Sequence, residues 1–318
     1  MNGKVLVTGA GGFIGRALCA RLAERRVPHV AAVRAIAGED ARRPGYVALG
    51  DFASADWHEV FDGVEVVVHL AGRAHITGSD ADSPTPFIVA NVHVTRRLTD
   101  AAARAGVRRI VFASTVKVYG ETTRPGRPFR AGDPPHPQDA YAHSKAEAEN
   151  VLRAMSAERG LDAVVLRLPL TYGPGVKGNF RTLLASIAAG RRLPLRGIVN
   201  RRSLLYVGNA VAAIEAAIAS PRPGLDALPI ADAETVSTSE LATRLARALG
   251  VESRLFALPT AFLRGAAMII GRGDEATRLV DSLEVDVTRF RELTGWTPPF
   301  SMDQGIAATV AWWRSVSR

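Results

Sequence analysis

Residues 8–15, which read TGAGGFIG, decide the fold of this chain. They end a short apolar run, residues 4–8, that is typical of a buried strand, and a helical pattern over residues 14–25 follows at once. Glycines at positions 9, 12 and 15 permit a tight turn, let backbone N–H groups approach a pyrophosphate, and allow the helix to pack closely on the strand. The N-terminus of that helix favours negative charge at the same place. Strand, glycine-rich turn and helix in this order predict a dinucleotide-binding site at the start of the chain.

Short apolar runs alternate with helical patterns through the first two-thirds of the chain. Many of these runs are too apolar to have a face in water, which is typical of a parallel sheet covered by helices on both sides. Strands are expected over residues 4–8, 29–34, 46–49, 64–70, 109–113 and 163–168. Helices are expected over residues 14–25, 53–61, 87–105 and 140–159. The pattern therefore predicts an α/β fold with a Rossmann-type, doubly wound parallel sheet.

The regular alternation ends after Pro169, where glycine, arginine and proline become frequent. We expect residues 1–170 to form the dinucleotide-binding domain. Residues 171–200 and 233–318 are expected to form a smaller C-terminal substrate-binding lobe. Residues 201–232 are expected to return to the first domain, so that its boundary is discontinuous.

Composition limits the compartment and the partners of the protein. The chain of 318 residues contains one cysteine, Cys19, so an intrachain disulfide cannot form and the cytoplasm is the expected location. No apolar stretch approaches the roughly 18 residues that span a bilayer, and neither a membrane segment nor a signal peptide is expected. The net charge is +9, but the arginines are scattered, so nucleic acid is not an expected partner. The apolar stretch 256–270 could be core, a dimer contact or a membrane-surface helix, and core is expected.

The end of the second strand indicates which dinucleotide is bound. A carboxylate there would bind the 2′-hydroxyl of NAD, whereas Arg34, which stands there, suits the 2′-phosphate of NADP. Among NAD(P)(H) we therefore favour NADP(H), with Glu39 or Asp40 as residues that could reach round and shift the preference to NAD. Asp51 and Phe52 follow the third strand, where they could hold and stack on the adenine or cap a following helix.

Tyr141 and Lys145 form a second constellation, because a spacing of four residues places a phenol and an ammonium on one face of a helix. We expect the ammonium to lower the pKa of the phenol, as a proton-transfer catalyst requires, although such a pair can also be a plain surface contact. Ser114 and Thr115 end the strand over residues 109–113, at the edge of the sheet where ligands of such folds bind. A hydroxyl there could hold a substrate oxygen, or it could satisfy the backbone of a turn.

The glycine loop, the strand-end hydroxyl and Tyr-x-x-x-Lys, in this order, resemble the extended short-chain dehydrogenase/reductase family. The resemblance is to its NAD-dependent epimerase/dehydratase branch, which acts on nucleotide sugars, and it covers nearly the whole chain. It includes Asn91 and the stretches LAG (residues 70–72), RLPLTYGP (residues 167–174) and GWTP (residues 295–298).

The resemblance implies roles for individual residues. It makes Thr115, Tyr141 and Lys145 the catalytic residues. The cofactor would be bound by Gly9, Gly12, Phe13, Ile14, Gly15, Arg34, Asp51, Phe52, Leu70, Ala71, Gly72, Tyr141, Lys145 and Pro169. The substrate would be bound by Arg73, His75, Asn179, Arg202, Arg278 and Asp281, with Asn179, Arg202 and Arg278 suited to a diphosphate. No metal is expected, and the family's use of helices like 87–105 and 140–159 as a dimer interface implies a homodimer.

The two residues that follow Thr115 limit the reactions that the enzyme is expected to catalyse. Sugar 4,6-dehydratases of this family carry an Asp-Glu pair there to eliminate water, whereas this chain has Val116 and Lys117, so dehydration is not expected. The remaining chemistry is hydride transfer at carbon 4 of a UDP-linked hexose, either as reduction of a 4-keto sugar or as 4-epimerisation. Arg34 and the resemblance of residues 115–117 and 174–180 to UDP-N-acetylquinovosamine-type reductases favour the reductase. A non-catalytic NADP-sensing regulator is the lesser alternative.

Overall fold

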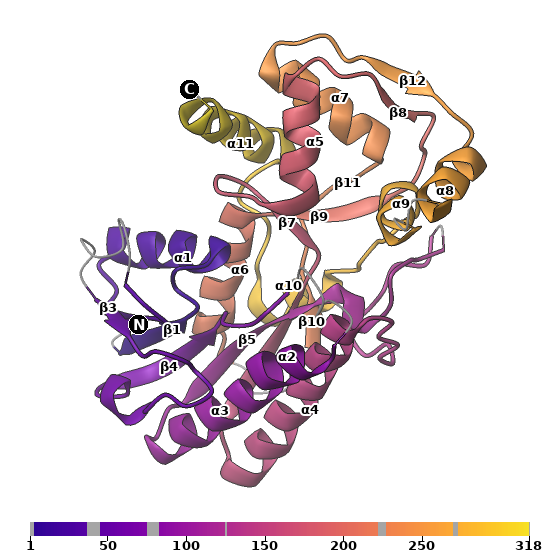
Figure 1. Cartoon of the computed structure of the whole chain (residues 1–318). Coiled ribbons are helices and arrows are strands. Elements are labelled where there is room, and N and C mark those ends of the chain that lie inside the picture. Colours follow the sequence, from indigo (N-terminus) through magenta and orange to yellow (C-terminus); the bar gives the residue numbers. More distant parts are fainter. Residues whose placement is uncertain are drawn as a thin grey trace.

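The computed structural model describes residues 3–36, 45–74, 83–124, 126–221, 227–269 and 273–317 (Figure 1). Its centre is a seven-stranded parallel sheet in the order β10-β6-β5-β4-β1-β2-β3. The strands are β1 (Lys4–Thr8), β2 (His29–Val33), β3 (Tyr46–Ala48), β4 (Val64–His69), β5 (Arg109–Thr115), β6 (Asp162–Leu168) and β10 (Ala227–Pro229). The order reverses direction beside β1, as a doubly wound sheet requires. The predicted fold class is confirmed, and the six predicted strands differ from the structure only at their ends.

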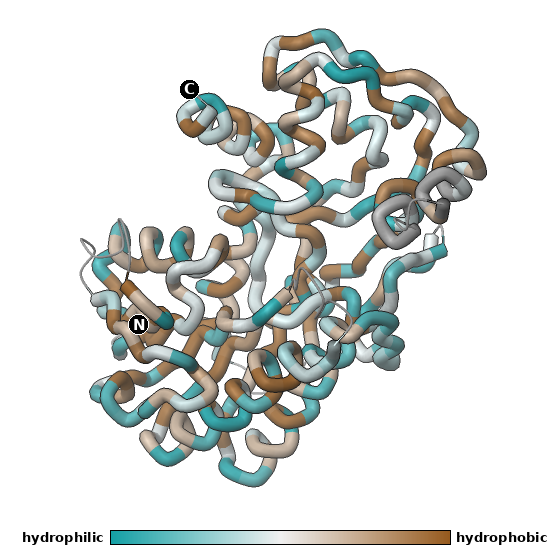
Figure 2. The backbone as a smooth tube through the Cα atoms, in the orientation of Figure 1, coloured by the Kyte–Doolittle hydropathy of each residue, from teal (hydrophilic) through white to brown (hydrophobic). Residues whose placement is uncertain are grey.

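Alternate residues of each strand enter the cores on opposite faces of this sheet. Val5 and Val7 of β1 join one core with α1 (Phe13–Glu24) and α6 (Val207–Ala219), whereas Leu6 joins a second core with α3 (Val94–Arg104) and α4 (Ala140–Arg159). Figure 2 shows apolar positions running along these central strands. Burial on both faces explains why the strand runs lack a polar side.

The helical predictions hold at residues 14–25 and 140–159 but fail at residues 53–61. That stretch holds only a short turn of 3-10 helix, η2 (His58–Val60), because Phe52 and Trp57 turn inward and pack on each other with ring centroids 5.2 Å apart. The stretch 87–105 begins in α2 (Thr85–Phe87) and continues into α3 through a π-helical segment, η3 (Ile88–His93). The homodimer expected over 87–105 and α4 stays a prediction.

The remaining elements build a second lobe, seen at the top of Figure 1. A three-stranded sheet holds β7 (Leu170–Tyr172), β9 (Arg202–Tyr206) and β11 (Thr235–Val236), and β8 (Leu193–Arg196) pairs with β12 (Leu255–Ala257). Its helices include α5 (Gly178–Ala188), α7 (Thr238–Leu249), α8 (Thr260–Ile269), α9 (Gly273–Val280) and α11 (Met302–Val316). The chain returns to the large sheet through α6 and β10, and again near α10 (Thr288–Thr294), where Phe290 and Trp296 join the core under α1.

The apolar stretch 256–270 is not core throughout, contrary to expectation. Phe262 is 70% exposed and Met268 is 73% exposed, whereas Leu263 packs against the core of the second lobe. Among the residues that the structure describes, no helix is both long and apolar enough to cross a membrane.

Candidate functional site

The glycine loop after β1 has the shape that a dinucleotide needs. Gly9 has a φ of +69°, and a Cβ there would lie 2.7 Å from the backbone nitrogen of Ala71. A Cβ at Gly15 would lie 2.2 Å from the carbonyl oxygen of Gly9, so both glycines are required for the turn and the helix to pack. Gly12 is the N-cap of α1 and supplies no capping side chain, which leaves the first N–H groups of the helix open to an anion. The residues present therefore fit the pyrophosphate of a dinucleotide.

Where the adenosine of a dinucleotide would lie, the structure differs from some of the predictions. Arg34 is exposed directly beyond the end of β2, and its contact with the cofactor stays a prediction. Phe52 is 6% exposed and packs on Trp57, so it is not free to stack on an adenine, and that prediction is wrong in this structure. The Asp51 carboxylate accepts the backbone N–H of Ala53 at 3.0 Å, which satisfies a turn. The alternative role of Asp51 as a helix cap is wrong, because residues 52–54 form that turn and no helix begins there. Glu39 and Asp40 lie outside the described residues.

The proposed catalytic hydroxyls meet at the carboxyl edge of the sheet. Thr115 ends β5 and is 7% exposed, and Tyr141 lies in the first turn of α4. Their side chains are hydrogen-bonded to each other. Residues 26 positions apart in the sequence are thereby brought into one site, because α4 crosses the sheet beside the end of β5.

A buried polar network fixes the first turn of α4. The Nδ2 group of Asn91 donates to Ser144 Oγ at 2.8 Å and to the carbonyl of Arg73 at 3.0 Å, and its Oδ1 accepts the Arg73 N–H at 2.8 Å. Ser144 in turn donates to the carbonyl of Tyr141 at 2.7 Å. The π-helical segment η3 therefore uses Asn91 to tie the loop after β4 to the turn that carries Tyr141. Arg73 is bound through its backbone, its side chain is exposed, and His75 lies outside the described residues.

Lys145 does not acidify Tyr141 in the way that the spacing suggested. The Lys145 ammonium lies 3.9 Å from the centre of the Phe112 ring, and burial lowers the pKa of Lys145 to about 7, although Glu149 opposes this. Burial raises the pKa of Tyr141 to about 12, the Asp139 carboxylate adds to the rise, and the hydrogen bond with Thr115 opposes it. The predicted direction is wrong for this structure, because desolvation of the phenol and the charge of Asp139 outweigh the hydrogen bond that opposes them.

His69 is a buried neutral histidine that sequence reasoning missed. Its Nδ1 lies 2.7 Å from Thr8 Oγ1 and its Nε2 lies 3.0 Å from Thr95 Oγ1, so hydroxyls on β1 and α3 hold both ring nitrogens. Burial, helped by the charge of Lys145, lowers the pKa of His69 to about 3. This histidine ends β4 directly below the glycine loop, where Thr8 Oγ1 also accepts the N–H of Ala71 at 3.3 Å.

A buried ion pair lies behind the catalytic residues. Glu149 accepts hydrogen bonds from Arg167 at 2.5 and 3.1 Å and from the hydroxyl of Ser114. The Arg167 guanidinium also lies 4.1 Å from the centre of the Tyr119 ring. Glu149 follows Lys145 by one helical turn, so its charge is the one that opposes neutralisation of Lys145.

Lys117, where dehydratases carry an acid, is bound to two carboxylates. Its Nζ lies 2.5 Å from Asp139 Oδ2 and 2.6 Å from Glu121 Oε1. Asp139 is the N-cap of α4, and its Oδ1 accepts the N–H of Ala142 at 2.7 Å. The sequence contained a signal for the contact of Asp139 with the Ala142 N–H, because an aspartate directly before a helix is a preferred N-cap.

Arg202 and Arg278, both predicted to bind substrate, come together across the second lobe. Arg202 Nη1 donates to the carbonyl of Asp281 at 3.1 Å, and burial, with the charge of Arg278, lowers the pKa of Arg202. Arg278 lies 3.8 Å from both Glu121 and Asp139, and its Nε is buried without a hydrogen-bond partner among the residues that the structure describes. An unsatisfied guanidinium beside a second one fits an anionic group with several oxygens. Asn179 is exposed in the first turn of α5.

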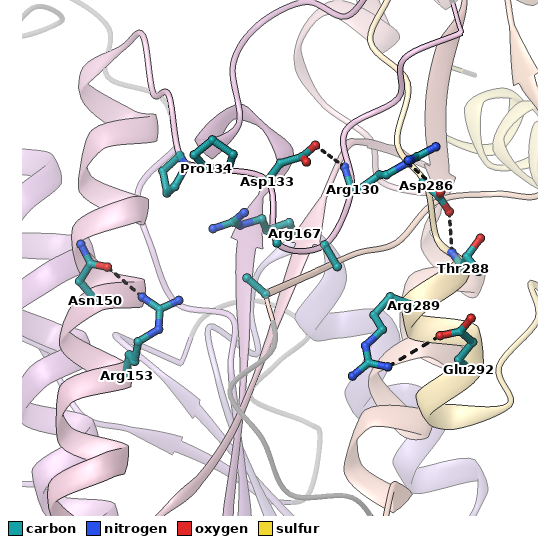
Figure 3. Close-up of a pocket in the computed structure, with 14 residues that line it drawn as sticks. Arg130, Asp133, Pro134, Asn150, Arg153, Arg167, Asp286, Thr288, Arg289 and Glu292 are labelled. Carbon is teal, nitrogen blue, oxygen red and sulfur yellow. Dashed lines mark hydrogen bonds and ion pairs between the residues drawn. The ribbon is translucent and has the colours of Figure 1, made fainter.

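Two cavities are lined in part by residues described above, one by Gly12 and Phe13 and the other by Arg167. A groove of about 1350 Å³ extends from residues 11–13 along α1 and α6. A smaller cavity of about 640 Å³ lies between α4 and α10, with the side chains of Arg153 and Arg289 on its two sides and Arg167 between them (Figure 3). Arginine and acidic side chains that line this cavity form ion pairs with each other, as in Arg130–Asp286 and Arg289–Glu292. Neither cavity includes Thr115, Tyr141 or Lys145 in its lining.

Comparison with known proteins agrees with this architecture. A model of the NAD dependent epimerase/dehydratase family matches residues 5–229. The chain is 34% identical over 314 residues to a UDP-glucose 4-epimerase of Vibrio cholerae, covering 97% of this chain and 95% of the relative. It is 32% identical over 333 residues to a dTDP-glucose 4,6-dehydratase of Streptomyces griseus, covering 98% and 94%.

Solved structures share the fold. A UDP-glucuronic acid 4-epimerase from Bacillus cereus in complex with NAD superposes with a TM-score of 0.80 at 19% identity, covering 98% of this chain and 96% of the other. MoeE5 in complex with UDP-glucuronic acid and NAD gives a TM-score of 0.79 at 25% identity, covering 99% and 100%. The family match spans more than half of the chain and the curated relatives span nearly all of it. The chain is therefore an enzyme of the NAD-dependent epimerase/dehydratase family, within the extended short-chain dehydrogenases/reductases.

Proposed function

We propose that this enzyme transfers hydride at carbon 4 of a UDP-linked hexose, with 4-epimerisation as the first candidate reaction. The observation that carries the proposal is the hydrogen-bonded pair of Thr115 and Tyr141 at the carboxyl edge of the sheet, next to Lys145 and the glycine loop. Oxidation or reduction of a secondary alcohol needs a proton donor and acceptor together with a second group that orients the oxygen. Two adjacent hydroxyls, one of them a phenol, supply both functions.

Each residue of the site takes a defined part in this proposal. A bound nicotinamide dinucleotide would supply the hydride acceptor and donor. Tyr141 takes the proton from the sugar hydroxyl in its phenolate form and returns it from the phenol, while Thr115 orients the same oxygen. The positive charge of an oxidised nicotinamide would favour the phenolate against the burial that raises the pKa of Tyr141. Lys145, whose ammonium form is disfavoured by burial, binds next to the cofactor ribose and holds the face of α4 on which Tyr141 lies. The low exposure of Thr115 and Lys145 keeps water from the reacting groups.

The diphosphate of the sugar nucleotide is proposed to bind Arg202 and Arg278. Both guanidinium groups are partly desolvated, and the free N–H of Arg278 offers a charge-assisted hydrogen bond. Asn179, at the start of α5, adds an uncharged donor from the same lobe. Anchoring by the diphosphate leaves the sugar ring free to present either face, which an epimerase requires.

Two alternatives are less well supported. Elimination of water needs an acid and a base after Thr115, whereas Lys117 is occupied by Asp139 and Glu121. A non-catalytic sensor has no need of the aligned pair Thr115 and Tyr141.

Reduction of a 4-keto sugar is the second candidate, and one observation favours it. Arg34 is exposed at the end of β2, where a guanidinium suits the 2′-phosphate of an exchangeable NADPH. The V. cholerae relative, named a UDP-glucose 4-epimerase, favours the first candidate instead, because it matches along nearly the full chain.

One experiment separates the two candidates. The enzyme is incubated with UDP-glucose or UDP-N-acetylglucosamine in the presence of NAD, and the sugars are followed by proton NMR. A parallel incubation contains UDP-N-acetyl-4-keto-6-deoxyglucosamine and NADPH, and the NADPH absorbance is followed. Interconversion of C4 epimers without net redox change supports epimerisation, and NADPH consumption with a reduced sugar supports reduction. Activity in neither incubation, with Tyr141→Phe as background control, would overturn the proposal.

A further inference from the structure

Lys117 joins two elements that each carry one catalytic hydroxyl. It lies in the turn η4 (Val116–Val118) directly after Thr115, and its backbone N–H donates to Thr115 Oγ1 at 3.3 Å. Its ammonium reaches across to Asp139, the last residue before α4, at 2.5 Å. The same side chain thus spans from the end of β5 to the start of the helix that holds Tyr141.

The contact with Asp139 acts on the first turn of α4. One carboxylate oxygen of Asp139 caps the helix through the N–H of Ala142 at 2.7 Å, while the other accepts from Lys117. Burial raises the pKa of Asp139, but the hydrogen bonds from Lys117 and Ala142 outweigh it and leave the pKa below its ordinary value. Tyr141 lies inside that capped turn, so a shift of the cap moves the phenol relative to Thr115.

Lys117 also balances charge next to the phenol. The charged and titratable groups around this turn are Asp139 and Lys145 from α4, Lys117 and Glu121 from the segment after β5, and Arg278 from α9. The Asp139 carboxylate disfavours ionisation of Tyr141. Lys117 lies closer to that carboxylate than Arg278 does, at 2.5 Å against 3.8 Å, so it provides the stronger compensation.

We propose that Lys117 is a positioning residue, which aligns Tyr141 with Thr115 by holding Asp139 at the N-terminus of α4. The expected effect of Lys117 on kcat rests on the proposed function, whereas its expected effect on the first turn of α4 does not. Lys117 is not assigned to the substrate, because its ammonium is already bound by Asp139 and Glu121 and its side chain is only 21% exposed. Its positive charge takes the place of the acid that dehydration would need, so the same residue that aligns the phenol also removes that reaction.

The test uses four variants of the full-length enzyme. Lys117→Met removes the charge, Lys117→Arg keeps it, and Lys117→Met with Asp139→Asn removes both charges while the amide still caps the helix. Lys4→Met is the matched control, because Lys4 pairs with Asp62 at the opposite end of the sheet, where β1 begins. The readout that needs no substrate is hydrogen exchange of the α4 first-turn amides, above all that of Ala142.

We expect Lys117→Met to speed exchange of the Ala142 amide about tenfold, while Lys4→Met leaves it unchanged. For the proposed reaction, Lys117→Met should lower kcat about ten- to a hundredfold with KM for the sugar nucleotide within about twofold, since misalignment acts on the reacting atoms. Lys117→Arg should retain most of the activity. The double variant should recover part of kcat, because no uncompensated carboxylate remains next to Tyr141.

Each failure has a separate meaning. Exchange at Ala142 that is equal in Lys117→Met, Lys4→Met and the unmodified enzyme would overturn the proposal even if no sugar nucleotide is turned over. A rise in KM with unchanged kcat would also overturn it, since Lys117 would then bind substrate. Absence of all turnover in the unmodified enzyme would instead count against the proposed function, while the exchange result would still decide the role of Lys117.

Discussion

Two regions of this enzyme, the proposed catalytic corner and the proposed diphosphate corner, are built in opposite ways. At the catalytic corner, His69, Thr115 and Lys145 are at most 7% exposed. Hydroxyls of Thr8 and Thr95 hold His69, and the Lys145 ammonium packs on the ring of Phe112. At the diphosphate corner, Arg278 is one-third exposed and makes only long ion pairs of 3.8 Å with Glu121 and Asp139. The first group of residues is fixed before substrate arrives, whereas Arg278 is held by contacts that an anion can replace.

This difference follows from what each corner has to do. Proton and hydride transfer depend on alignment to within a fraction of an ångström, which a packed interior provides. Binding of a diphosphate depends on charge, and weak ion pairs keep guanidinium groups in place without satisfying them fully. Desolvation is therefore the main cause of pKa shifts at the catalytic corner, where it makes Lys145 and His69 favour their neutral forms.

The largest effect should come from the catalytic corner. Tyr141→Phe removes the group that exchanges a proton with the sugar oxygen, and we expect kcat to fall about a thousandfold with little change in KM. Steady-state kinetics with the substrate identified by NMR measure this change. Tyr119→Phe is the matched control, because it removes another buried phenol hydroxyl, which donates to the carbonyl of Ala227 at 3.4 Å and interacts with Arg167. Equal losses in both variants would mean that the effect is structural.

The pH dependence of stability should come from the same corner. The pKa of His69 is lowered to about 3 in the folded protein, so between pH 6.5 and 3 the unfolded chain binds a proton at this residue that the folded chain does not. Stability is therefore lost as the pH falls below 6.5, and His69 should contribute a loss of about 2 kcal/mol between pH 7.5 and 5. Urea unfolding at the two pH values measures it.

Two controls sharpen this test. His69→Gln should flatten the pH dependence, whereas His58→Asn, at an exposed turn, should leave it unchanged. Carbon-13 NMR of the His69 imidazole reads the same property without a variant. An imidazole that protonates near pH 6.5 would contradict the buried, neutral state.

The smallest effect should come from the diphosphate corner. Arg202→Met removes one charge-assisted donor, and we expect KM for the sugar nucleotide to rise about ten- to fiftyfold while kcat changes less than about threefold. Arg201→Met is the control, because Arg201 is exposed and pairs with Glu284 at 2.7 Å. A fall in kcat with unchanged KM would show that the two corners are not separate in function.

The sequence alone was sufficient to predict the parallel sheet and the segments that meet at its carboxyl edge. The glycine loop, the strand ends and the Tyr-x-x-x-Lys spacing are local patterns, and the structure places them at one edge of the sheet as predicted. Two predictions about the site failed because packing decides them. Phe52 turns into the core against Trp57, and burial raises the pKa of Tyr141.

What the sequence determined by itself were the parallel sheet, the order of its helices and the residue types able to carry out hydride transfer, since each depends on short-range periodicity and spacing. Only the tertiary structure decided which distant side chains share a contact. Lys117 meets Asp139, His69 lies between Thr8 and Thr95, and Arg278 approaches Glu121 because folding brings together residues 22 to 157 positions apart in the chain. Burial, charge compensation and pKa depend on those contacts, and no local pattern in the chain encodes them.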